Sequence, residues 1–155
     1  MQWTDKGIIL GTKKHGERNA IAEIYTEHHG RHLGLVKYAS SKAMRSCLQP
    51  GNTVNIEWRA RLDEHLGAYS LEPETHRAAR LIECPIGIYA IQAIASLLRL
   101  LPERDSYPYI YNYFNVMLDH LDNPFDVAGL YIRLELAVLN ELGFGLDLSK
   151  CAQTG

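Results

Sequence analysis

Five short segments with strand-like patterns, separated by turn residues, fill the first half of the chain. The clearest is residues 53–59, where Val54, Ile56 and Trp58 alternate with polar side chains, as in a strand with one buried face. The other four are residues 4–12, 20–26, 32–38 and 66–71. Short strands with regular turns favour a small closed barrel, because closure leaves no exposed strand edge. We therefore predict a five-stranded OB-fold barrel within a first domain, residues 1–80.

Helical periodicity dominates the second half. Residues 86–101, between Pro85 and Pro102, are apolar nearly all round, which predicts a buried central helix. Two further helices are predicted, over residues 107–121 and after Asn123, a residue type suited to capping a helix N-terminus. The chain is thus expected to be a two-domain β + α protein, with an all-α helical bundle over residues 81–155.

Charge differs between the halves although the formal net charge is only -2. Residues 1–80 hold 12 Lys and Arg against 9 Asp and Glu, whereas residues 81–155 hold 4 against 9. In OB-fold barrels, single-stranded nucleic acid lies between the first and fourth loops, here residues 13–19 and 60–65. Each barrel cation alone is explained by ordinary solvation, but their joint enrichment favours phosphate binding. The candidates are Lys13, Lys14, Arg18, Arg31, Lys37, Lys42, Arg45, Arg59 and Arg61.

Aromatic and histidine side chains add two weaker signals. Tyr38 and Trp58 are flat groups on which bases stack, although Trp58 alternates with core positions and is better assigned to the core. His28, His29 and His32 have no cysteine or paired carboxylate beside them in sequence, so we expect solvated or backbone-bonded histidines rather than metal ligands.

Little in the sequence supports an enzymatic function. There is no phosphate loop, nucleophile elbow or catalytic constellation, and Cys47 near Lys42 and Arg45 is a weak candidate nucleophile. Three scattered cysteines, no secretory signal and no apolar run of ~20 residues indicate a cytoplasmic protein without a membrane segment. We expect no catalytic residues, no metal site and no cofactor in this chain.

Short motifs in a fixed order extend along almost the whole chain. They are residues 3–10 (WTDKGIIL), 15–17 (HGE), 30–37 (GRHLGLVK), 48–52 (LQPGN), 101–104 (LPER) and 142–148 (LGFGLDL). Through these motifs the chain resembles the RecO family of bacterial DNA repair and recombination mediator proteins. The resemblance implies an N-terminal OB-fold followed by a helical domain.

Function is implied by the same resemblance. Family members bind single-stranded and double-stranded DNA, anneal strands, and work with RecR and single-strand-binding protein to load RecA. A nucleoid-associated protein is therefore expected. The second hypothesis is an interaction adaptor whose helical domain binds a partner's acidic tail beside Arg104 or Arg133, although the net -5 of that half argues against a broad acidic-tail site. For Arg133 an ordinary surface ion pair is the alternative.

Two departures from the family pattern stand out. Tyr38 replaces a small residue after Lys37, and a structural tyrosine is expected there more than a base-stacking one. Cys151 resembles the first cysteine of the family's zinc module, but one cysteine cannot form a four-ligand site. Zinc is thus expected only in a full-length protein, and the helical domain is expected to be C-terminally truncated.

Overall fold

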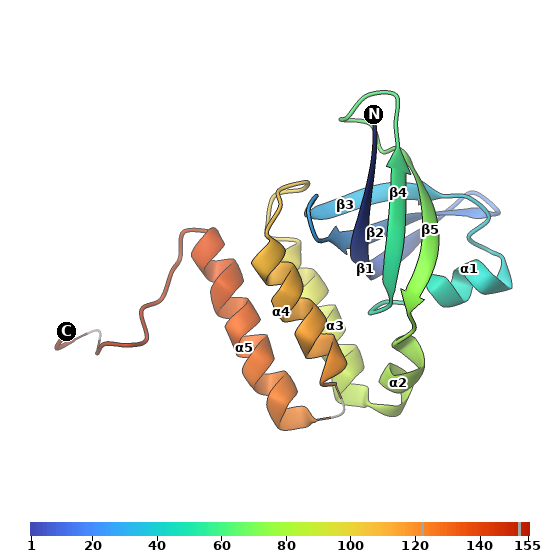
Figure 1. Cartoon of the computed structure of the whole chain (residues 1–155). Helices are drawn as coiled ribbons and strands as arrows, with labels where there is room; N and C mark the ends of the chain where they lie inside the picture. Colours follow the sequence, from blue (N-terminus) through green and yellow to red (C-terminus); the bar gives the residue numbers. More distant parts are fainter. Residues whose placement is uncertain (122, 152) are drawn as a thin grey trace.

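The first half of the chain closes into a five-stranded barrel. The computed structural model of the chain describes residues 1–121, 123–151 and 153–155. The short helix α1 (Lys42–Cys47) links β3 to β4 (Figure 1). The strands are β1 (Gln2–His15), β2 (Asn19–Thr26), β3 (Arg31–Val36), β4 (Thr53–Arg59) and β5 (Ala68–Thr75), hydrogen-bonded in the order β1-β2-β3-β5-β4. The predicted five-stranded barrel is confirmed.

The long strand β1 belongs to two sides of the barrel. Its first half pairs antiparallel with β4 and its second half pairs antiparallel with β2, with a register shift between Ile9 and Gly11. Such a shift lets a strand bend and twist more strongly, which suits closure of a small barrel. Because β1 runs past residue 12, Lys13 and Lys14 are strand residues and not turn residues as predicted.

The inner faces of the strands form the barrel core. Val54, Ile56 and Trp58 are all buried, as the alternation in residues 53–59 predicted. Gly34 of β3 faces the Tyr69 ring so closely that a Cβ at this position would lie 2.5 Å from ring carbons. The glycine inside this strand therefore marks a close approach, one of the roles that glycine has in strands.

The fifth strand differs from the prediction at both ends. β5 begins two residues later than residue 66 and continues to Thr75, four residues beyond the predicted end at residue 71. Pro73 is tolerated because it pairs at the irregularity between Thr53 and Val54 of β4, and Pro is accepted at bulges and strand ends.

Among the described residues, four helices follow the barrel: α2 (Ala78–Glu83), α3 (Pro85–Leu98), α4 (Pro108–Asp119) and α5 (Pro124–Glu141). The three long ones each begin at a proline, whose missing N–H costs nothing in the first turn. The Asn123 side chain accepts a hydrogen bond from Phe125 N, as predicted for a cap. None of the helices in the described part of the chain has the length and apolar character needed to span a membrane.

Helix α3 is not buried all round, contrary to the prediction. Its inner face packs in the helical core, but Ile86, Ile88 and Tyr89 are exposed by 48%, 40% and 72%. Apolar character on every side of a helix is therefore a poor guide to burial here, because only one face of α3 meets α5, α2 and β1.

Barrel and helices share one continuous core at their junction. Ile8 and Tyr25 of the barrel belong to the same buried cluster as Ile94 and Phe114 of the helices. Arg77 stabilises the same junction. It is buried, with 5% exposed, and its side chain donates hydrogen bonds to Asp119, Asn115 and Thr53. The proposed boundary between residues 80 and 81 falls inside α2 and stays a prediction.

Candidate nucleic-acid interface

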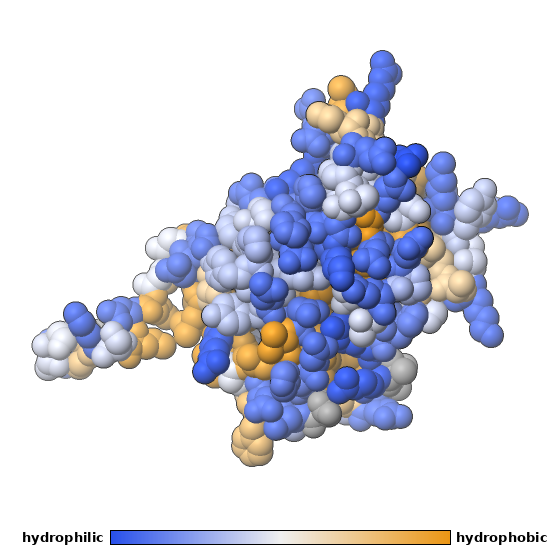
Figure 2. Space-filling model, viewed as in Figure 1, coloured by the Kyte–Doolittle hydropathy of each residue, from blue (hydrophilic) through white to orange (hydrophobic). Residues whose placement is uncertain are grey.

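Six exposed cations gather at one end of the barrel, around the tip of the β1–β2 hairpin, the turn after β3 and α1. This set, here called the basic end, comprises Lys13, Lys14, Arg18, Lys37, Lys42 and Arg45. Glu17 is the only acidic residue in the segments 12–20 and 37–49 that carry it. Figure 2 shows hydrophilic side chains projecting from this end of the molecule, at the right.

Hydrogen bonds hold the two segments of the basic end together. Tyr38 N donates to the Asn19 side chain at 3.2 Å, and Ser40 N donates to the Arg18 carbonyl at 3.3 Å. Within the described residues none of the six cations takes part in an ion pair. Their charges are therefore available to an external anion.

Tyr38 stands among these cations with its ring in solvent. The side chain is 67% exposed, and the backbone has a φ of +54°, in the left-handed region that non-glycine residues rarely adopt. The expectation of a structural, packed tyrosine is wrong, because little of the ring is covered. An exposed aromatic ring within a cationic surface is the arrangement that stacks unpaired bases.

A shallow groove of about 410 Å³ extends from the basic end along the outer face of β2 and β3. Lys13 lies at one end of it and Arg99 of α3 at the other, with Ile21 and Leu33 between them. Its polar centre is Glu23, whose carboxylate accepts hydrogen bonds from Arg99 at 2.6 to 3.1 Å. The groove therefore combines apolar side chains with charged groups at both ends and at its centre.

Arg31 does not belong to the basic end, although it was a candidate. Its side chain is 11% exposed, donates to Glu23 at 3.1 Å and lies 3.2 Å from Glu103. These partners lie on β2 and on the α3–α4 connection, so no local pattern around residue 31 could predict them. Arg31 is thus held in a structural ion-pair cluster.

Arg59, the last residue of β4, and Arg61, on the β4–β5 loop (residues 60–67), form a second, smaller group of cations. Both are exposed, and Arg59 also pairs with Glu57 of its own strand at 2.6 Å. The loop rises at the top of Figure 1, whereas α1 lies at the right. Gly67 accepts a hydrogen bond from Leu35 N at 3.0 Å, so this loop borders β3 on the side away from β2.

The two candidate partner-binding arginines have different surroundings. Arg104 donates through its guanidinium to the carbonyls of Asp63 and His65 in the β4–β5 loop. Arg133 is exposed on α5 beside a groove of about 350 Å³ between α4 and α5. That groove is lined by Val116, His120, Phe125, Asp126, Gly129, Leu130 and Arg133.

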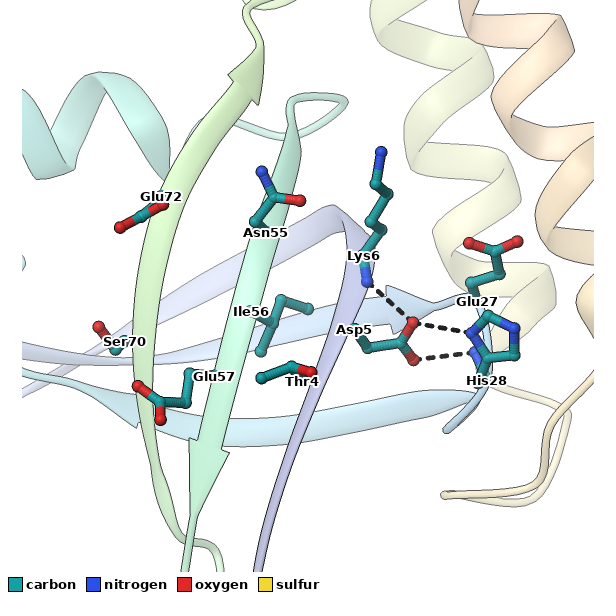
Figure 3. Close-up of a pocket in the computed structure, with 10 residues that line it drawn as sticks. All are labelled: Thr4, Asp5, Lys6, Glu27, His28, Asn55, Ile56, Glu57, Ser70 and Glu72. Atoms are coloured by element: carbon teal, nitrogen blue, oxygen red, sulfur yellow. Dashed lines mark hydrogen bonds and ion pairs between the residues drawn. The ribbon is translucent and has the colours of Figure 1, made fainter.

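Asp5, Glu27 and His28 form a cluster that sequence reasoning missed, and they lie at a pocket of about 560 Å³ (Figure 3). Asp5 accepts a hydrogen bond from His28 N, and its oxygens lie 3.0 and 2.8 Å from Nδ1 of His28 and His29. Burial raises the pKa of the Asp5 carboxyl, but these bonds outweigh burial and hold its pKa below the ordinary value. No sequence signal links residues 23 positions apart, and the bonds give Asp5 a structural role.

His32 is the buried histidine of the three. It is 2% exposed, and its Nδ1 lies 3.0 Å from both the Tyr69 hydroxyl and the Leu33 carbonyl. Burial, with the nearby charge of Arg104 adding to it, lowers the pKa of His32 to about 4. The ring also contacts Trp58 edge-on at 5.1 Å, so His32 belongs to the barrel core.

Cys47, the candidate nucleophile, is not a reactive thiol. Cys47 is buried, and burial raises the pKa of its thiol, the opposite of what a nucleophile needs. Cys151 is exposed and lies outside the group of potential metal ligands found among the residues described.

Comparison with known proteins identifies the family. Residues 1–73 match the family model described as "Recombination protein O N terminal", and residues 85–155 match "Recombination protein O C terminal". The chain belongs to the RecO family. The curated relatives are named as DNA repair proteins, in agreement with the family predicted from the motifs.

Curated RecO relatives match over the whole of this chain. It is 59% identical to the DNA repair protein RecO of Sinorhizobium medicae, 54% identical to that of Agrobacterium fabrum and 50% identical to that of Brucella abortus, each over 155 residues. The matched region is 62%, 61% and 63% of those relatives. The chain therefore spans about three fifths of their length.

Proposed function

We propose that this chain binds single-stranded DNA through the basic end and the adjoining β2–β3 groove, and acts as a mediator of DNA repair and homologous recombination. The supporting observation is the basic end itself, with six cations that form no ion pair among the described residues, one acidic residue and the exposed ring of Tyr38. Cations neutralise phosphates and release counterions, and a flat ring accepts an unstacked base.

Annealing follows from the same chemistry. Two complementary strands repel each other through their phosphates, and a surface that neutralises part of this charge lowers the barrier to pairing. The proposed role includes binding of double-stranded DNA, cooperation with RecR, and loading of RecA onto strands coated by single-strand-binding protein. It requires no catalytic residue and no cofactor.

A salt series on single-stranded DNA tests the electrostatic part. For the double variant Lys13→Ala, Lys14→Ala we expect affinity at low salt to fall about tenfold, and the slope of log K against log salt to decrease by about 1.4. The measurement is fluorescence anisotropy of a labelled oligothymidylate. The double variant Lys6→Ala, Lys150→Ala removes the same charge elsewhere and should change both quantities little. Equal losses in both double variants would contradict a localised site.

The groove beside Arg133 supports a second candidate function, that of an adaptor for partner proteins. Phe125 is 90% exposed at its edge, and Gly129 leaves open space where a side chain would stand. An apolar floor with an arginine at its edge suits the acidic C-terminal tail of single-strand-binding protein. Arg104 is the weaker candidate, because its guanidinium already donates to two carbonyls.

Binding of a synthetic peptide with this acidic tail separates the two functions. Arg133→Ala should weaken peptide binding about tenfold or more while DNA binding stays unchanged, since the groove lies on the helices. Arg45→Ala, in the basic end, is the matched control and should show the reverse. If both variants bind the peptide equally well, the adaptor site lies elsewhere.

A further inference from the structure

The connection between α3 and α4 presses against the start of β3. A Cβ on Gly30 would lie 1.9 Å from the Asp105 carbonyl oxygen, so only glycine permits this approach. Arg104 N donates to the Arg31 carbonyl at 3.0 Å, and Glu103 forms a bridge with Arg31. The helical half is thus anchored to the barrel by backbone contacts at this point.

Arg104 extends from this anchored segment into the β4–β5 loop. Its φ of +67° turns the chain there, and its guanidinium donates to the carbonyls of Asp63 and His65. The base of the loop is held separately, by a hydrogen bond of 3.1 Å from Trp58 Nε1 to the Leu66 carbonyl. Residues 61–66 are exposed to solvent, and within them His65 N donates to the Leu62 carbonyl at 3.1 Å. The two bonds from Arg104 join this exposed tip to the helical half.

We propose that Arg104 is a positioning residue for nucleic-acid binding: it holds the β4–β5 loop, and with it Arg61, as the second border of the binding face. The inference rests on the proposed function. A loop already ordered in its binding conformation loses less conformational entropy when a ligand arrives, which raises affinity without a new contact. The helical half thereby shapes a surface that lies on the barrel.

A double-mutant cycle between Arg61 and Arg104 tests this coupling. Arg61→Ala alone should weaken oligothymidylate binding about threefold, and Arg104→Ala alone about threefold to fivefold. The double variant should bind about as well as Arg104→Ala alone, because a disordered loop no longer presents Arg61. A general loss of positive charge would give multiplied losses instead, so additive free energies overturn the proposal.

Two controls keep the outcome decisive. Lys13→Ala combined with Arg104→Ala should show multiplied losses, since Lys13 lies on the β1–β2 hairpin and not on the loop. Tryptic cleavage after Arg61 should become about tenfold faster in Arg104→Ala, and Arg104→Lys, which keeps one donor, should fall between that variant and the native chain. Unchanged cleavage would overturn the positioning role even if Arg104→Ala proved too unstable for binding work.

Failure of this inference and failure of the proposed function give different results. If the Lys13, Lys14 double variant loses affinity while Arg61→Ala and Arg104→Ala do not, the DNA-binding role stands and the loop takes no part in it. If none of these variants changes affinity, the proposed function itself is wrong.

Discussion

The basic end and the barrel–helix junction are both rich in positive charge, yet they differ in where that charge goes. At the basic end, six cations face solvent without an ion pair among the described residues. At the junction, Arg31, Arg77, Arg99 and Arg104 each donate to an acceptor on a different element. The same residue type therefore serves an external ligand in one region and holds the fold together in the other.

Solvation accounts for the difference. An exposed lysine keeps its water and its counterions until a polyanion displaces them, so it contributes to binding and hardly to folding. A buried guanidinium has already lost its water and depends on its acceptors, so removal of either partner destabilises the protein. Substitutions at the basic end should therefore change affinity, and substitutions of the largely buried Arg31 and Arg77 should change stability. Arg99, exposed in the proposed groove, and Arg104, which holds the β4–β5 loop, are expected to affect DNA binding as well.

The largest effect is expected from Arg77→Ala at the junction. The change removes donors to Asp119, Asn115 and Thr53, and should lower the free energy of unfolding by about 3 kcal/mol, as measured by urea denaturation. DNA affinity of the folded variant should stay unchanged. Arg133→Ala, at an exposed position, is the control and should cost no more than about 0.5 kcal/mol. If both variants lost a similar free energy of unfolding, the proposed difference between the buried Arg77 and the exposed Arg133 would be wrong.

A second prediction concerns pH and the buried His32. Because its pKa falls from 6.5 in the unfolded chain to about 4 in the folded barrel, stability present above pH 6.5 should be lost as the pH drops toward 4. The loss attributable to this group is about 3 kcal/mol over that interval. Unfolding midpoints from pH 7 to pH 4 measure it. The dependence of the free energy of unfolding on pH should become weaker in His32→Gln. It should remain in His76→Gln, which alters an exposed histidine.

Tyr38→Gly should produce a smaller change, confined to the basic end. Glycine accepts the left-handed backbone at this position, so the variant removes the ring without adding strain. Loss of one stacked base should weaken single-stranded DNA binding by about 1 to 2 kcal/mol and leave the salt slope as it was. Tyr38→Phe should bind normally. A change in salt slope would show that Tyr38 acts through neighbouring cations rather than by stacking.

The smallest effect on binding is expected from Arg31→Ala. Its guanidinium is engaged by Glu23 and Glu103, so DNA affinity should change less than about twofold while stability falls by about 1 kcal/mol. Lys37→Ala, six residues along the chain, should show the opposite pattern. Strong loss of DNA binding in Arg31→Ala would move Arg31 back among the ligand-binding residues.

Sequence periodicity predicted the elements whose one face is buried and whose ends carry clear signals. Residues 53–59 were predicted to the residue, and the prolines at 85 and 124 located helix starts. β5 was predicted too short, because Pro73 looks like a terminator unless the register shift in β4 is known. Propensity acts locally, whereas tolerance of a proline depends on the partner strand.

The candidate site was predictable in part for the same reason. The cations of the β1–β2 hairpin follow from its place between two alternating strands, and they are found together with Lys37 and Arg45. The pairing of Arg31 was not predictable, since Glu103 lies far along the chain. The network of Arg77 was missed because its flanking residues resemble an ordinary helix start.

The dual pairing of β1 has a consequence for how the protein reaches its folded form. The same strand closes the barrel by pairing with β4 and places Lys13 and Lys14 near the hairpin tip. A shift of one residue in the pairing register of β1 would turn its side chains to the opposite face of the sheet and disrupt its pairing with β4. A chain with the wrong β1 register therefore cannot close the barrel. Closure thus ensures that Lys13 and Lys14 point in the correct direction.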